Sequence, residues 1–225
     1  MRVVSAAAPR GGGWLLGWAL ALAAIVVFAG FGRWQLGRMH DKQAKLEAAA
    51  RALDRRAPQP LLLASDPKRA RAYDWAAGSG SIGGRTVWLD NQLRAGRAGV
   101  RMYCVLLPDD GVQALLVDAG WWPLDASRTL PVFGCPLGRG VAVRGLLAPP
   151  PSSGLARGDA LAAAGPQRWL ATRLDLAVIA RELKLSTGIA PRVLRLDPAR
   201  NKSDAGVMLA PGERDLDILP NTLTP

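Results

Sequence analysis

Few side chains in this sequence are of the types that carry out catalysis or bind metals. His40 is the only histidine, and it lies far in sequence from every plausible nucleophilic serine. A serine nucleophile needs a general base, most often histidine. Two thiols and one distant imidazole at these spacings cannot form a zinc site, and Asp109 and Asp110 lie in a turn-like segment. The sequence therefore predicts a protein that is not an enzyme, and it disfavours a membrane-tethered hydrolase.

The two cysteines allow two interpretations. Cys104 and Cys135 are 31 positions apart and do not form a Cys-x-x-Cys motif. In an oxidising compartment they could pair as a disulfide. Unpaired cysteine is also among the most buried residue types and packs as a small apolar side chain. We expect two small apolar side chains here, with a disulfide as the alternative.

Two aromatic segments remain as candidate interaction sites. Residues 32–38 place Trp34, Gln35 and Arg38 directly after an apolar stretch, where tryptophan and arginine commonly anchor a helix among lipid head groups. Residues 120–123 read Gly-Trp-Trp-Pro and follow a predicted strand. Buried indoles there would close a core, whereas exposed ones would mark a partner surface.

The first of these segments follows an uncharged stretch that can span a membrane. No charged side chain occurs in residues 11–32, and Arg10 and Arg33 lie on either side. As a helix these residues would cover roughly 33 Å, enough for the hydrocarbon core of a bilayer. A cleavable signal peptide would have a shorter apolar region that ends in a small-x-small site. We therefore expect a transmembrane helix over residues 12–32, preceded by a cytoplasmic segment, 1–11.

Beyond the span, apolar residues recur at spacings of three and four until Pro58 and Pro60. This periodicity predicts that the membrane helix continues as an amphipathic helix over residues 33–57. The apolar stripe fits packing against the rest of the chain. A groove for a partner helix is the alternative.

Residues 58–225 are predicted to form one β-rich domain. Short segments rich in β-formers are separated by glycine and proline turns, without βαβ alternation. A helix is expected at about 175–184, a long surface loop at 148–165, and an extended tail from Asn201. The strand candidates are residues 85–90, 100–107, 112–118, 140–147, 168–171 and 191–196. The fold class is a membrane-anchored, β-rich α+β protein whose domain is a small antiparallel barrel or sandwich with one helix.

The charge of the chain says little about its partners. The formal net charge is +11, but the basic residues are mostly scattered arginines and no nucleic-acid-binding module is present, so we expect no nucleic-acid partner. The first arginines fit contact with anionic lipid head groups. Two arginines precede the span and four basic residues closely follow it, which weakly places the domain in the cytoplasm.

The sequence resembles the Surfeit locus protein 1 family, whose members are assembly factors for cytochrome c oxidase. The resemblance extends over residues 12–225 and rests on the order and spacing of several short motifs. The matching residues are Gly32, Trp34, Gln35 and Arg38 of a G-x-W-Q-x-x-R motif; Leu89-Asp90-Asn91 and the turn at Gly99-Val100; Leu115-Leu116-Val117 with Gly120, Trp121 and Pro123; Pro150-Pro151-Ser152; and Asn221 of a Leu-Pro-Asn-Thr segment.

The resemblance implies a membrane-bound chaperone that assists haem a insertion into subunit I of haem-copper cytochrome c oxidase, or stabilises that subunit. It implies an anchor in a bacterial inner membrane and a periplasmic domain, which overrides the local charge count. Membrane lipid, subunit I and haem-synthesis enzymes would be the partners. Trp34, Gln35 and Arg38 would contact lipid, a partner helix or the propionates of transiently bound haem a, and Trp121 would help to dock the partner. The alternative is a bitopic periplasmic binding or scaffold module unrelated to haem.

The sequence departs from the family pattern at two places. Ala119 stands where the family usually has an arginine. Members also normally continue past the segment of Asn221 into Glu-Arg-His and a second membrane helix, and neither follows here before Pro225. We therefore expect either a truncated sequence or a one-span member, and the haem-ligand role of that histidine passes to no residue here, His40 included.

Overall fold

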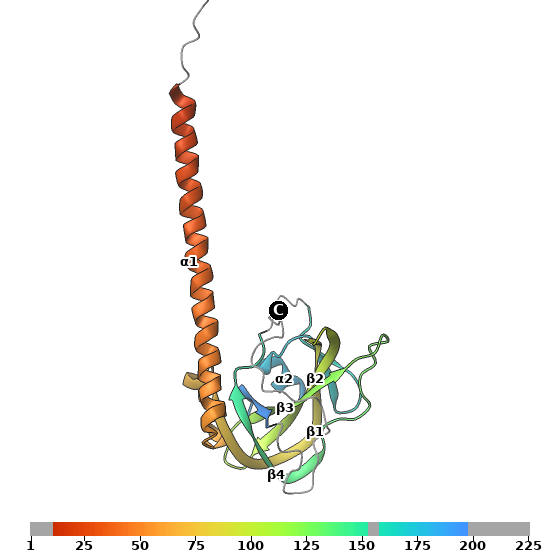
Figure 1. Cartoon of the computed structure of the whole chain (residues 1–225). Helices are drawn as coiled ribbons and strands as arrows, with labels where there is room; N and C mark the ends of the chain where they lie inside the picture. Colours follow the sequence, from red (N-terminus) through yellow and green to blue (C-terminus); the bar gives the residue numbers. More distant parts are fainter. Residues whose placement is uncertain (1–10, 153–157, 198–225) are drawn as a thin grey trace, which may run out of the picture. The chain divides into compact units, whose positions relative to one another are not determined.

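The computed structural model describes residues 11–152 and 158–197. It contains one long helix, α1 (Gly11–Arg55), followed by strands and short helices (Figure 1). Residues up to Glu47 form one compact unit, and the residues from Ala48 onward form a second. We call the second unit the β domain.

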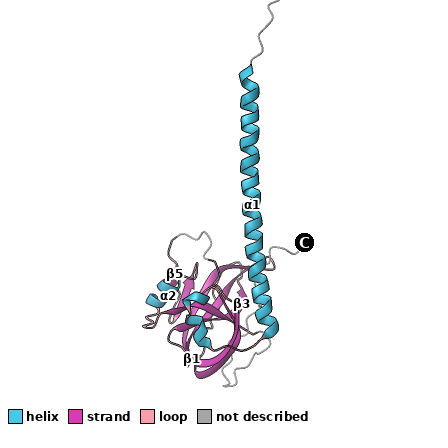
Figure 2. Ribbon diagram, turned by 90° about the vertical axis from the view of Figure 1, so that its left-hand side faces the viewer, coloured by secondary structure: helices cyan, strands magenta, loops and turns pink. Residues whose placement is uncertain are grey.

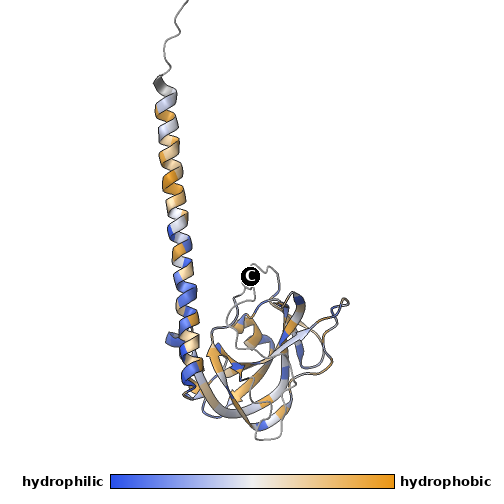
Figure 3. Ribbon diagram, in the orientation of Figure 1, coloured by the Kyte–Doolittle hydropathy of each residue, from blue (hydrophilic) through white to orange (hydrophobic). Residues whose placement is uncertain are grey.

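The described part of the N-terminal unit is helical and belongs to α1, which continues into the second unit. This helix is long and apolar enough to cross a membrane, and its apolar side chains, such as Phe28, are exposed. Figure 3 shows α1 changing from mainly hydrophobic to mainly hydrophilic along its length. The prediction that the apolar helix runs on without a break is confirmed, because α1 ends only at Arg55, shortly before Pro58.

The β domain is built on one sheet, seen with its flanking helices in Figure 2. The strand order is β2-β3-β7-β4-β1-β6-β5, and β2 also pairs with β1. The pairings therefore form a closed circuit through β1, β2, β3, β7 and β4. The strands are β1 (Asp74–Arg94), β2 (Arg97–Pro108), β3 (Ala114–Pro123), β4 (Leu137–Ala148), β5 (Leu161–Ala163), β6 (Arg168–Ala171) and β7 (Ile189–Leu196); the short helices are η1 (Leu61–Ser65), η2 (Pro67–Arg69) and α2 (Leu176–Glu182).

Most of the predicted elements are present. Each predicted strand overlaps an observed one, and α2 lies within the predicted helix, where the side chain of Asp175 caps its first turn by accepting a hydrogen bond from the Val178 N–H. The sheet is mixed rather than wholly antiparallel, because the β3–β7 and β1–β6 pairs are parallel. The predicted loop at 148–165 is also partly wrong, since it contains β5.

β1 begins at Asp74, whereas the predicted strand begins at residue 85. The glycine-rich segment before residue 85 also belongs to the strand, because it packs closely against η1 and β2. A Cβ on Gly78 would lie 2.8 Å from the side chain of Leu61, and one on Gly80 would lie 2.4 Å from the carbonyl oxygen of Leu107. Glycine is therefore required where η1 and β2 approach the strand. β-Propensity alone gives no sign of this extension.

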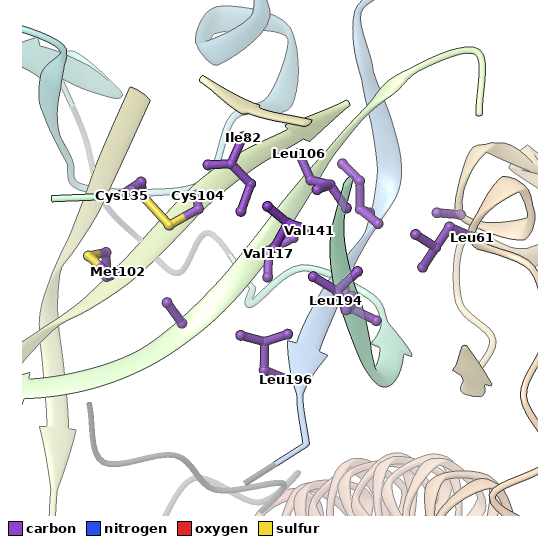
Figure 4. Packing of buried hydrophobic residues seen from close by; sticks show 14 of the residues in the cluster. Leu61, Ile82, Met102, Cys104, Leu106, Val117, Cys135, Val141, Leu194 and Leu196 are labelled. Carbon is purple, nitrogen blue, oxygen red and sulfur yellow. A yellow bond between two sulfur atoms is a disulfide. The ribbon is translucent and has the colours of Figure 1, made fainter. Parts of the chain in front are cut away.

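Both faces of the sheet are buried, and each face has its own apolar cluster. Along β2, Met102, Cys104 and Leu106 belong to one cluster (Figure 4), while Tyr103 and Val105 belong to another that includes Ile179 of α2. Successive side chains of a strand point to opposite faces. Burial of both faces explains why the central strands are almost continuous apolar runs rather than alternating ones.

The expectation of two reduced cysteines is wrong. Cys104 and Cys135 form a disulfide with a Cα–Cα distance of 5.5 Å, visible in Figure 4. It joins β2 to the segment just before β4. The spacing of 31 residues in the sequence carries no information on this distance, which is set by the pairing of β1 with both β2 and β4.

Candidate functional site

The motif residues of the β domain lie together, at the end of the sheet where β1 turns into β2. Gly99 pairs with Gln92 of β1 on one side and with Pro123 of β3 on the other. Asn91 has a positive φ of 56° and lies at the irregularity between Leu89 and Gln92. Segments that are separate in sequence thus form one cluster, which we call the motif cluster: Asn91, Gly99, Gly120, Trp121 and Pro123.

Trp121 is at the centre of this cluster and is buried, with 1% of its surface exposed. Its indole N–H donates a 2.9 Å hydrogen bond to the Gln92 carbonyl. A Cβ on Gly99 would lie 2.4 Å from the indole ring, and the guanidinium of Arg97 lies 5.3 Å from the ring centroid. Trp121 is therefore a buried side chain that closes the core, and it is not part of an exposed partner surface.

Gly120 joins the cluster to a buried carboxylate. Its N–H donates a 3.1 Å hydrogen bond to Asp118, and its φ of 125° is one that side chains rarely adopt. Asp118 also accepts a hydrogen bond of 2.7 Å from Arg101, and Arg195 lies 3.8 Å away. The neighbouring Ala119 is fully buried in the core, so this position has no ionic role in this chain.

The second tryptophan of the segment belongs to an aromatic group at the edge of the core. The half-buried ring of Trp122 lies 5.5 Å from Trp88 and 5.5 Å from Phe133, centroid to centroid. Phe133 lies on the connection between β3 and β4, which the disulfide holds at Cys135. Arg128 of the same connection donates to Asp90 and to the Asn91 side chain at 2.7 and 3.3 Å. The motif cluster thus supports this connection.

The membrane-exit motif lies on α1, in the other unit. Trp34 is 56% exposed, and the guanidinium of Arg38 lies 5.3 Å from its ring centroid. Positions four apart share one helix face, so these two side chains form one exposed aromatic-cationic pair. Gly32 and Gln35 lie on the same helix, and Asn221 falls outside the described residues.

A buried ion-pair group had almost no signal in the sequence. Arg192 is fully buried and bonds to Asp74 at 2.5 Å and to the Leu63 carbonyl. Arg69 donates to the same carboxylate at 2.5 Å. Burial alone would raise the pKa of Asp74, but the hydrogen bonds from Arg69 and Arg192 outweigh it and lower that pKa below its usual value. The only sign was one arginine inside a predicted apolar strand.

The family is decided by a comparison of the whole sequence with family models. The model of the SURF1 family matches residues 22–222. The chain belongs to the SURF1 family. This family is associated with the assembly of cytochrome oxidase. Searches of curated proteins and of solved structures each found no match.

The sequence resemblance implies transient contact with haem a, and the described residues do not provide a complete site for it. Both cysteines are in the disulfide, and no cluster of metal-ligating side chains occurs within residues 11–152 and 158–197. Successive residues of an α-helix are rotated by about 100° around its axis. Arg38 therefore lies about 40° from Trp34 around α1, whereas His40 lies about 120° from Trp34. A propionate contact by Arg38 would therefore have no histidine beside it.

Proposed function

We propose that this chain is a non-enzymatic, membrane-anchored assembly factor for haem-copper cytochrome c oxidase. It would act in a bacterial inner membrane, with the β domain in the periplasm. The observation that carries the proposal is the SURF1 family match over residues 22–222. The motif cluster of the β domain supports it, because a degenerate relative would not need to keep Gly99 under Trp121.

The disulfide supports the periplasmic location of the β domain. Cys104 is fully buried and Cys135 is 8% exposed, and their pairing holds the β3–β4 connection beside Trp88. Structural disulfides form and persist in oxidising compartments and are rare in the cytoplasm. An alkaline phosphatase fusion at the C-terminus of the full chain should therefore be active, since that reporter needs the periplasm. An inactive fusion of full-length, stable protein would contradict this orientation.

The membrane-exit motif can supply a contact for either mode of action, stabilisation of subunit I or assistance of haem a insertion. The described residues include an aromatic-cationic pair that suits lipid, a partner helix or a propionate, but no histidine beside it. We propose that Trp34 and Arg38 contact subunit I or lipid at the membrane surface. Any contact with haem a would then be transient and limited to its propionates.

A deletion strain tests the function directly. Loss of the chain should lower cytochrome c oxidase activity and the haem a signal in difference spectra of membranes, and a plasmid copy should restore both. Trp34→Ala and Arg38→Ala should restore less than the wild type. Leu36→Ala, an exposed position on the same helix, is the matched control. Normal oxidase in the deletion strain would refute the proposal and leave the bitopic scaffold as the better reading.

A further inference from the structure

A groove outside the motif cluster forms where β1 separates from its neighbours. It has a volume of about 420 Å³ and is lined by residues 81–83 of β1, Leu107 of β2 and residues 137–139 of β4. None of these residues belongs to the family motifs described above. The groove is therefore a separate feature of the β domain.

The groove follows from the bend in β1. The β1–β2 register shifts between Ile82 and Thr86, and the β1–β4 register shifts between Gly80 and Ile82. The last β1 residue that pairs with β4 is Gly83, and the next residue, Gly84, has a φ of 74°. Strand pairing is thus interrupted on both sides of the bend, which opens a depression floored by the buried Ile82.

The walls of this groove are apolar and exposed to solvent. Leu107 is 45% exposed and Leu137 is 77% exposed, and they lie on different strands on either side of the bend. Single exposed leucines are common, but two on the walls of one groove make a contiguous apolar surface. Such a surface favours a bound apolar group over water.

One charge lies at the edge of the groove. Arg139 is its only charged lining residue, it is exposed, and it has no ion-pair partner within the described ranges 11–152 and 158–197. The groove therefore combines apolar walls with a guanidinium that can pair with a carboxylate. Charge complementarity requires an acidic group next to the apolar one in whatever binds there.

The open shape of the groove indicates a polypeptide rather than a small molecule. Small ligands are usually bound in concave sites that bury most of their surface, whereas this groove is wide open to solvent. Protein interfaces instead place an apolar anchor in a shallow pocket with polar groups around it. We propose that the groove docks a short segment of an oxidase subunit in which an apolar side chain is adjacent to an aspartate or glutamate. This inference rests on the proposed function and names the chemistry of the partner segment.

Photo-crosslinking in cells tests the docking site. With p-benzoylphenylalanine in place of Leu137 in the full-length chain, we expect a crosslink to an oxidase subunit, at a segment with adjacent apolar and acidic residues. Arg139→Glu should reduce the crosslink roughly fivefold, as expected for loss of one surface ion pair, and Arg139→Lys should largely retain it. The controls are the photo-reactive residue at Leu93, an exposed leucine outside the groove, and Lys184→Glu, a charge reversal elsewhere on the β domain.

The outcomes separate this inference from the proposed function. A crosslink only to lipid or to a second copy of the chain, or an equal oxidase crosslink from Leu93, would overturn the groove assignment. So would full restoration of oxidase by the double variant Leu107→Ser, Leu137→Ser, made at two solvent-exposed positions of the groove. Normal oxidase in the deletion strain would instead overturn the proposed function.

Discussion

Large apolar side chains have opposite surroundings in the two units of this protein. In α1, Leu22 and Phe28 are 59% and 74% exposed, and nothing in their own unit covers them. In the β domain, residues of similar size such as Leu106 and Leu116 are fully buried. The exposed apolar surface of α1 fits a lipid environment, whereas the apolar side chains of the domain pack against one another. Changes in the two units should accordingly affect different properties.

The largest effect on the domain is expected from Arg192→Met. This change leaves the partly buried Asp74 carboxylate without one of its two arginines and the Leu63 carbonyl without a donor. Breaking a buried pair by removing one partner costs about 3–5 kcal/mol of unfolding free energy. Urea unfolding of the detergent-solubilised chain measures it. Arg181→Met, at an exposed position, should change stability by less than about 0.5 kcal/mol, and equal losses would contradict the buried-pair account.

Removal of the disulfide should have the next largest effect on the domain. Loop-closure entropy for a cross-link over a sequence separation of 31 residues corresponds to about 3–4 kcal/mol. Cys104→Ser combined with Cys135→Ser should lower the urea midpoint, and a reducing agent should lower the wild-type midpoint but not that of the variant. Membrane association should be unchanged in both cases. A wild-type midpoint that does not respond to complete reduction would refute the structural role of the bond.

A charge in the middle of the apolar helix should weaken membrane association and leave the folding of the β domain unchanged. Leu22→Arg places a charge near the bilayer centre, at a cost of about 3 kcal/mol in insertion free energy. The variant should be extracted from membranes by alkaline carbonate more readily than the wild type. Its disulfide should still form in the fraction whose β domain folds. Leu22→Ile is the control, and carbonate resistance equal to the wild type would contradict the membrane assignment.

Replacement of glycine by alanine should affect the stability of the domain differently at two positions, Gly99 and Gly83. Gly99→Ala forces a Cβ to within 2.4 Å of the Trp121 ring, so we expect a loss of about 1–3 kcal/mol from overpacking. A Cβ on Gly83 would have no atom within 4 Å, and this position has no positive φ. Gly83→Ala should therefore change the stability by close to zero. Thermal unfolding followed by tryptophan fluorescence compares the two variants. Similar losses for both would mean that Gly99 is not held against Trp121.

The smallest effect is a dependence of domain stability on acid. The pKa of Asp74 is lower in the folded chain than its ordinary value of 3.8, so the folded state favours the ionised form. This contribution is fully present above the unfolded pKa and is lost as the pH falls through the lower folded pKa. Asp74→Asn should flatten the decline in stability below about pH 4, whereas the exposed Asp159→Asn should not. Stability curves with the same slope in both variants would contradict this.

The parts of the structure that were predictable are those whose signal is local. The apolar helix needs only a run of uncharged residues, α2 needs its cap at Asp175 and one apolar face, and the β2–β3 hairpin needs the turn at 108–111 between two apolar segments. The motif cluster was predictable in its members, through the family resemblance. Its geometry was not, because Gly99 and Trp121 meet only across strands of the sheet.

Sequence alone thus determined that this chain has a helix long and apolar enough to span a membrane, a β-rich domain and membership of the SURF1 family. Tertiary structure alone decided that Cys104 meets Cys135, that the glycine-rich start of β1 is a strand, that Trp121 is buried, and that Arg192 pairs with Asp74. The physical reason is distance along the chain. A helix forms from neighbours within four residues, whereas each of these contacts depends on strands brought together from far apart in sequence, so its partners exist only once the sheet has closed.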